Sequence, residues 1–252
     1  MEFFHNGRRL LLFDANTDDD TSSLLRAVVE WKPFLDWLSR VEEGFNISRI
    51  LFTDVFRTPH GRMLFLSAKV FWKNAEQAVD HITYLSLRED VVGAFVVVKR
   101  QVRDGNEWIA MVEQERIASG ERSHLEIVAG IRDGELPQTC ALREIEEELG
   151  LLALGITLDP DRLFPLAPLP DGTNRPIAVS SGSSTERISL FAYQMILPDE
   201  AIKRLDGHVA GLESEGERTT VRLVHVNKIP EIGDLKTIAA LHLYMIAQLH
   251  LG

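Results

Sequence analysis

The stretch ALREIEEELG, residues 141–150, crowds acidic side chains onto what otherwise has the composition of a helix. The acids are Glu144, Glu146, Glu147 and Glu148. Like charges three or four residues apart on a helix repel, each pair by about a few tenths of a kcal/mol. At roughly 100° per residue, Glu144, Glu147 and Glu148 share one face, an apolar stripe lies away from it, and Gly150 is well placed to end the helix. The crowding therefore needs either full solvation or a bound cation.

The residues before this helix decide between those two interpretations. Glu135 ends the turn AGIRDGE, Arg143 follows eight residues later, and then comes Glu-Ile-x-Glu-Glu-x-Gly-Leu. The pattern resembles the signature of the Nudix hydrolases: Glu, seven residues, Arg-Glu-aliphatic, any residue, Glu-Glu, any residue, Gly-aliphatic. Six fixed identities would coincide by chance on the order of once in ten to the eighth start positions. A merely solvated acidic face is the weaker interpretation.

The start of the motif departs from the family pattern. The family usually has five residues between its leading glycine and the first glutamate, whereas only four residues separate Gly130 from Glu135, and Ala129 occupies the expected position. A deletion of one residue in the loop accounts for this spacing.

The resemblance implies a divalent-metal centre. A pyrophosphate is shielded by negative oxygens, and Mg²⁺ or Mn²⁺ neutralises them, lowers the pKa of bound water and aligns its attack. Hard cations of this kind prefer oxygen ligands. The family's ligands correspond to Glu144, Glu147 and Glu148, with a backbone carbonyl matching Ala129.

Two further residues of the motif are implied to have structural roles. Arg143 and Glu135 are expected to form a buried ion pair that fixes the loop against the helix. A contact of Glu135 with a metal through water is the alternative.

The resemblance covers roughly residues 85–245 and extends to the ADP-ribose and nucleotide-sugar pyrophosphatase branch. VEQERI (112–117) and LEIVAG (125–130) are similar to the strands that precede the motif there. SSGSSTERISLF (180–191) is similar to that branch's SPG-x-x-x-E loop, with Ser181 where proline is usual. This alignment implies that Arg116 binds the diphosphate or ribose and Glu186 the terminal sugar. The alternatives are a salt bridge at a strand end for Arg116 and a solvated loop acid for Glu186.

The segment GLESEGE (211–217) is similar to the acidic loop that in this branch carries the general base. Glu215 matches the base position, and Glu217 is the substitute two residues on. A loop base is physically sensible, because closure over substrate excludes water and assembles the site only when it is occupied. An ordinary surface charge is the alternative.

Composition limits the partners and the compartment. The 252 residues carry a net charge of −11, which argues against sequence-independent binding of nucleic acid. No apolar run reaches the roughly 20 residues that span a bilayer, and the N-terminus is not a secretory signal. Cys140 is the only cysteine, which fits a reducing compartment and predicts a cytoplasmic protein.

The pattern of elements predicts two parts. Residues 1–88 are expected to form an N-terminal α+β segment, with a helix over 21–43 that Pro33 kinks or splits and a β-hairpin over 47–72. Residues 89–252 are expected to form a Nudix-type α/β/α sandwich with a mixed β-sheet. In the resembling branch a β-rich N-terminal segment takes part in dimerisation, which implies a homodimer.

The sequence therefore predicts a Mg²⁺- or Mn²⁺-dependent hydrolase of the pyrophosphate bond in a nucleoside diphosphate linked to a sugar, such as ADP-ribose. The products would be a nucleoside monophosphate and a sugar phosphate. The alternatives are hydrolysis of a nucleoside triphosphate or dinucleoside polyphosphate, and a non-catalytic nucleotide-sugar sensor.

Overall fold

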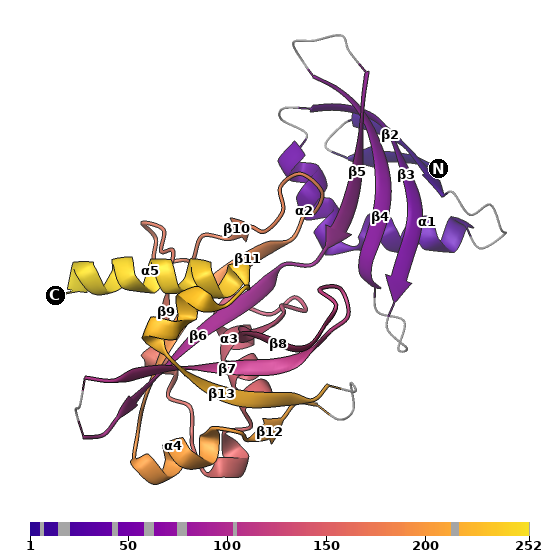
Figure 1. Cartoon of the computed structure of the whole chain (residues 1–252). Helices are drawn as coiled ribbons and strands as arrows, with labels where there is room; N and C mark the ends of the chain where they lie inside the picture. Colours follow the sequence, from indigo (N-terminus) through magenta and orange to yellow (C-terminus); the bar gives the residue numbers. More distant parts are fainter. Residues whose placement is uncertain are drawn as a thin grey trace. The chain divides into compact units, whose positions relative to one another are not determined.

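The computed structural model describes residues 1–5, 8–14, 21–41, 45–57, 63–74, 80–102, 105–212 and 217–251 (Figure 1). The chain divides into two compact units. The first consists of Met1–Asp90 together with Ala178–Arg187, and the second of Val91–Ile177 and Ile188–Gly252. The sequence predicted a division between residues 88 and 89. It did not predict that residues 178–187 belong to the first unit.

The first unit is a sheet with strand order β1-β2-β3-β4-β5 and two helices. Its elements are β1 (Glu2–His5), β2 (Arg8–Asp14), α1 (Thr21–Glu30), α2 (Lys32–Val41), β3 (Phe45–Arg57), β4 (Met63–Asn74) and β5 (Asp80–Arg88). Strands β2 and β3 are parallel, so α1 and α2 form the crossover between them. Pro33 lies in the first turn of α2, which confirms that the predicted helix is split.

One face of this sheet carries the core of the first unit. Phe34 of α2 packs edge-on to Phe52 of β3 with ring centroids 5.9 Å apart, within a cluster that includes Leu12 and Leu66. The predicted hairpin is confirmed, because β3 and β4 pair antiparallel. The first two strands had no counterpart among the predicted elements.

The second unit is built on a mixed sheet with strand order β10-β11-β6-β8-β7-β13-β12, and β9 pairs with β11. Its strands are β6 (Val91–Arg100), β7 (Glu107–Arg116), β8 (Glu121–Ile131), β9 (Leu163–Pro165), β10 (Ile177–Ala178), β11 (Arg187–Leu197), β12 (Val209–Ala210) and β13 (Thr219–His225). Its helices are α3 (Pro137–Leu149), α4 (Asp199–Leu205) and α5 (Leu235–Leu251), with short 3-10 turns at Leu152–Leu154, Pro160–Arg162 and Val226–Glu231.

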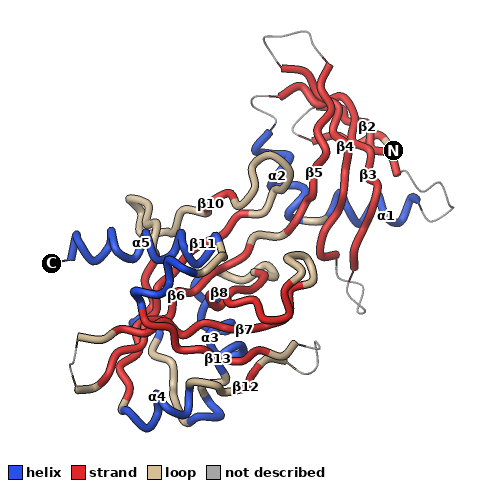
Figure 2. The backbone as a smooth tube through the Cα atoms, in the orientation of Figure 1, coloured by secondary structure: helices blue, strands red, loops and turns tan. Residues whose placement is uncertain are grey.

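Helices α3 and α5 cover opposite faces of this sheet (Figure 2). On β6, Val96 packs in one cluster with Ile145 of α3, whereas the neighbouring Phe95 packs against Tyr244 of α5 with ring centroids 5.4 Å apart. Since successive strand residues point to opposite faces, the two helices flank the sheet. The Nudix-type α/β/α sandwich predicted from the sequence is confirmed.

Strand β8 positions the site because it changes partner along its length. It pairs with β7 up to Ile127 and with β6 from Val128 to Ile131. The chain then turns through residues 132–136 into α3. The helix begins at Pro137, before the acidic stretch 141–150, because proline fits the first helical turn. Gly150 ends α3 with φ 61°, a conformation that favours glycine.

Candidate active site

The acidic face of α3 is pressed against the end of β8. Glu148 is 5% exposed, and its Oε2 accepts a hydrogen bond of 3.0 Å from the Ala129 amide. Glu144 is 8% exposed and lies so close to Gly130 that a Cβ at that position would be 1.8 Å from Glu144 Oε1. A side chain at 130 would have to displace the Glu144 carboxylate, which supplies a physical reason for a glycine beside the shortened loop.

Arg143 joins the loop to the acidic face. Its Nε donates to Glu135 Oε2 at 2.9 Å, and its Nη1 lies 2.8 Å from Glu144 Oε1 and 2.7 Å from Glu147 Oε2. Its Nη2 donates to the Ile131 carbonyl at 3.2 Å. The expected ion pair between Arg143 and Glu135 is present, but it is half-buried rather than buried. One guanidinium thus ties three acids of the motif together.

The ionisation of Glu144 reflects competing effects. Burial raises its pKa, Arg143 lowers it, and the charge of Glu147 raises it again, with the result that the pKa is about 7. Arg143 itself is stabilised as a cation: burial works to lower its pKa, but its contacts with the acids raise it overall.

The negative charge of Glu148 is offset even less than that of Glu144. Burial raises its pKa well above the ordinary value, the hydrogen bond from Ala129 lowers it, and the charges of Glu144, Glu126 and Glu217 raise it further. Two neighbouring carboxylates in a desolvated site are therefore short of positive charge.

The residues that flank the acidic loop are hydrogen-bonded to the end of α3. The Gly211 amide donates to the Glu147 carbonyl at 3.1 Å, and Thr219 Oγ1 donates to the Glu148 carbonyl at 2.9 Å. Glu217 is near enough to raise the pKa of both Glu144 and Glu148. Glu215, the residue predicted as the base, lies outside the described residues.

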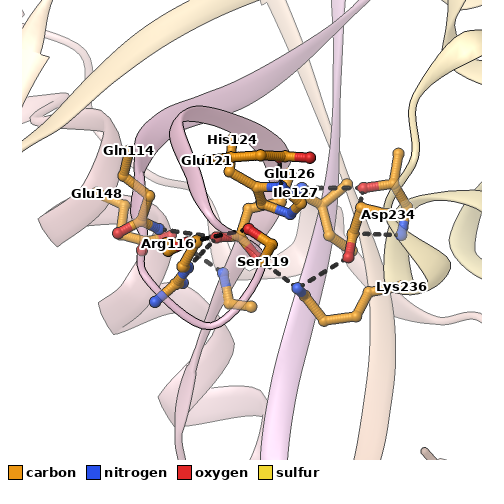
Figure 3. A network of polar contacts seen from close by, with 12 residues as sticks. Gln114, Arg116, Ser119, Glu121, His124, Glu126, Ile127, Glu148, Asp234 and Lys236 are labelled. Carbon is orange, nitrogen blue, oxygen red and sulfur yellow. Dashed lines mark hydrogen bonds and ion pairs between the residues drawn. The ribbon is translucent and has the colours of Figure 1, made fainter.

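Arg116 lies at the end of β7 beside a buried carboxylate (Figure 3). Its Nε donates to Glu126 Oε1 at 2.6 Å, and its side chain is 44% exposed. The same oxygen accepts from Gln114 Nε2 at 3.1 Å, and the ammonium of Lys236 binds Oε2. The strand-end salt bridge considered for Arg116 is therefore present, and it leaves part of the guanidinium open to solvent.

Sequence reasoning missed Glu126 and Lys236. Glu126 stands between apolar residues in LEIVAG, and a charge inside a buried strand is a usable signal. Lys236 follows Asp234 at the start of the last helix and had no such signal.

Glu186, the predicted sugar-binding residue, belongs to the first unit. There it forms an ion pair of 2.9 Å with Arg88. The Thr185 hydroxyl accepts a hydrogen bond of 3.0 Å from the Arg88 amide, so this loop is fixed to β5.

A second group of potential metal ligands consists of His124, Glu126 and Asp234, whose ligand atoms lie within 4.8 Å of one another. Lys236 Nζ binds both Glu126 and Asp234, the latter at 3.1 Å. An ammonium thus already balances these two acids. The acidic face of α3 is the better metal candidate, because the pKa values of Glu144 and Glu148 stay raised even though Arg143 contacts Glu144.

The residues of α3 fit a hard divalent cation. Glu144, Glu147 and Glu148 offer carboxylate oxygens from one helix face, with the backbone of Ala129 beside them, and this is the ligand type that Mg²⁺ and Mn²⁺ prefer. When bound, such an ion would neutralise the phosphate oxygens and activate water.

Two hollows lie elsewhere in the second unit. One of about 380 Å³ is lined by residues that include Tyr193 and Arg204, and one of about 610 Å³ by residues that include Lys99 and Gln194. Neither is lined by the acids of α3, so the site is assigned from its chemistry rather than from cavity volume.

The sandwich fold and the carboxylate-bearing face of α3 beside β8 are both features that the resemblance to the Nudix hydrolases predicts. The NUDIX domain matches residues 88–239, more than half of the chain, so the chain belongs to the Nudix family and is a Nudix hydrolase. Hydrolases of this family generally use divalent metals.

Two similar proteins illustrate the relationship. Nudix hydrolase 14, chloroplastic, from Arabidopsis thaliana is 28% identical over 249 residues, which cover 90% of this chain and 74% of that protein. The crystal structure of an ADP compounds hydrolase aligns with a TM-score of 0.52 and 16% identity over 82% of this chain and 96% of that one, a likeness of fold. Among the described residues, no helix is long and apolar enough to cross a membrane.

Proposed function

We propose that the chain hydrolyses the pyrophosphate bond of a nucleoside diphosphate linked to a sugar, ADP-ribose or a related compound, with Mg²⁺ or Mn²⁺. The products are a nucleoside monophosphate and a sugar phosphate. The observation that carries the proposal is the pair of buried, undercompensated carboxylates Glu144 and Glu148 beside Ala129 and Gly130.

Each predicted residue has a role in this proposal. Glu144, Glu147 and Glu148 hold the metal with the Ala129 carbonyl, and Arg116 binds the diphosphate. Glu186 binds the terminal sugar. Arg143 and Glu135 fix the loop, and Gly150 ends the helix.

The general base is a loop glutamate, Glu215 or Glu217. Glu217 is supported by its electrostatic influence on Glu144 and Glu148. Glu215 is supported by its match to the family pattern.

A panel of sugar-linked nucleoside diphosphates, nucleoside triphosphates and dinucleoside polyphosphates tests the substrate class. Each is incubated with protein and Mg²⁺, and the products are separated by chromatography before a phosphatase is added. A sugar phosphate with an equal amount of nucleoside monophosphate supports the proposal. Turnover of a triphosphate alone favours a different Nudix substrate, and binding without turnover in saturating Mg²⁺ favours a sensor.

We also propose that the chain forms a homodimer through the first unit. The sheet face turned away from α1 and α2 exposes Phe13, Ile82 and Tyr84, the last 67% exposed. Light scattering tests this: the expected mass is twice 28.4 kDa, and Tyr84→Lys should shift it toward the monomer.

We propose a cytoplasmic location. The Arabidopsis relative is named as chloroplastic, so imaging of the tagged full chain has the plastid as its alternative outcome.

A further inference from the structure

The buried carboxylate Glu126 is the centre of a charge network that the metal site does not account for. It is 2% exposed, and an unpaired charge at such a position is strongly destabilising. Its two oxygens are satisfied separately: Oε1 accepts from Arg116 and Gln114, and Oε2 binds Lys236. Arg116 and Lys236 approach it from opposite sides (Figure 3).

Lys236 is placed there by the first turn of α5. Asp234 Oδ2 accepts from the Thr237 amide at 2.9 Å and from the Thr237 hydroxyl at 2.7 Å, which caps the helix. Thr237 Oγ1 in turn accepts from the Ile127 amide at 3.1 Å, where β8 changes partner. The start of α5 is therefore anchored to the strand that carries Glu126.

The way Glu126 holds Arg116 matters for substrate. The bond uses the Nε atom, so the two terminal amino groups remain for another acceptor, and the side chain is almost half exposed. A guanidinium can present two parallel donors to phosphate oxygens. Glu126 is also close enough to Glu148 to raise its pKa, so the network adjoins the metal-binding face.

We propose that Lys236 and Glu126 are positioning residues: the Lys236 ammonium fixes the Glu126 carboxylate, which orients Arg116 toward the diphosphate of the substrate. This inference rests on the proposed function, in which Arg116 contacts the diphosphate. If Lys236 is removed, Arg116 is the close cation that this network still offers to Glu126 and Asp234. These acids then draw the guanidinium inward, away from the position in which it faces the substrate. Lys236 therefore acts through Arg116 and does not itself touch substrate.

A double-mutant cycle tests the proposal. Arg116→Ala, Lys236→Met and the double variant are compared with wild type on the substrate that the panel identifies. We expect each single variant to raise KM by about tenfold, the order of a lost hydrogen bond to a charged group, with kcat changed less than about twofold. The double variant should match Arg116→Ala, because Lys236 has no effect once Arg116 is gone.

Two further variants separate positioning from folding. Lys236→Arg keeps the cation and should restore KM to within about threefold of wild type. Glu126→Gln/Lys236→Met removes the Glu126 charge together with the ammonium and leaves Asp234 bonded to Thr237, so its thermal midpoint should recover toward wild type from that of Lys236→Met while the raised KM is kept. Lys228→Met, which removes an exposed lysine paired with Glu231, is the matched control and should leave KM unchanged.

Several outcomes overturn the inference. They are a KM in the double variant equal to the product of the single effects, a loss of kcat alone, or an unchanged KM in Lys236→Met or Arg116→Ala. If wild type turns over only a different diphosphate-containing nucleotide, the sugar-linked substrate is wrong and the same cycle is run on that nucleotide. If it binds without turnover, the cycle is run on the Kd for ADP-ribose with Mg²⁺, and absence of any binding refutes both proposals.

Discussion

Two groups of buried acids in the second unit are balanced in opposite ways. Glu126 and Asp234 are bridged by Lys236, which lowers the pKa of Asp234 despite a burial effect in the other direction. Burial works to lower the pKa of Lys236, but the two acids raise it overall. Burial raises the pKa of Glu144 even though Arg143 pairs with it, and burial raises the pKa of Glu148 as well. A cluster of carboxylates therefore indicates a metal more strongly where the protein's own cations leave the pKa values of buried acids raised.

The strongest way to break this comparison is to neutralise one acid of the undercompensated group. Glu148→Gln should reduce kcat by roughly a thousandfold, because the proposed buried metal ligand is lost while the shape is kept. Steady-state kinetics with saturating Mg²⁺ measure this effect.

Glu146→Gln is the matched control for that variant. Glu146 belongs to the same helix, but its Oε1 accepts from the Leu152 amide rather than facing the metal site, and glutamine keeps that acceptor. It should retain full activity. Full activity in Glu148→Gln would refute the metal assignment.

Removing the cation of the compensated group should lower stability and raise KM while leaving kcat nearly unchanged. Lys236→Met should destabilise the fold by about 2 kcal/mol, because it leaves buried acids unbalanced. Urea unfolding measures this loss. Lys228→Met should change the free energy of unfolding by less than about 0.5 kcal/mol, and an equal loss in both variants would contradict the comparison.

The contact between Gly130 and Glu144 offers a sharper probe of metal affinity. In Gly130→Ala the new Cβ must displace the Glu144 carboxylate, so the half-saturating Mg²⁺ concentration should rise about tenfold. Gly233→Ala is the control, since a Cβ there meets nothing within 4 Å. Activity titrations with Mg²⁺ compare the two, and equal midpoints would show that Glu144 is not a ligand.

The smallest expected effect is on the pH dependence of stability without metal. The folded state raises the pKa of Glu144 from 4.5 to about 7, so the stability this group contributes is complete below 4.5 and is lost as the pH rises through about 7. The thermal midpoint in a chelator should thus fall by a few degrees between about pH 6 and about pH 8, and Mg²⁺ should reduce the fall.

Asp234 should behave in the opposite sense. Its pKa is lowered from 3.8, so its contribution is present above that value and is lost as the pH falls through the folded pKa. Glu144→Gln should flatten the change near neutral pH and leave the acid limb in place. A chelated wild type with no decline near neutral pH would contradict the sign.

The sequence predicted those features that depend on neighbouring residues. The spacing of Glu144, Glu147 and Glu148 placed them on one helix face, and the similarity of VEQERI and LEIVAG to strands of the family indicated β7 and β8. The site roles assigned to these residues remain predictions.

Contacts across long separations could not be predicted in the same way. Lys236 and Glu126 are 110 residues apart, and neither residue's local pattern identifies the other as its partner. The return of 178–187 to the first unit likewise depends on backbone pairing, such as the Ser86 amide with the Ser183 carbonyl at 2.8 Å. Residues 178–187 carry no local pattern that identifies this isolated bridge to β5.

The divided pairing of β8 makes two of its backbone amides natural reporters. The Ile127 amide donates to Thr237 of α5, and the Ala129 amide donates to Glu148 of α3. Amide hydrogen exchange at position 127 would follow the docking of the last helix. Exchange at position 129 would report whether Glu148 turns away from the strand toward an arriving ion. The two amides of β8 therefore report separately on its contact with α5 and its contact with α3.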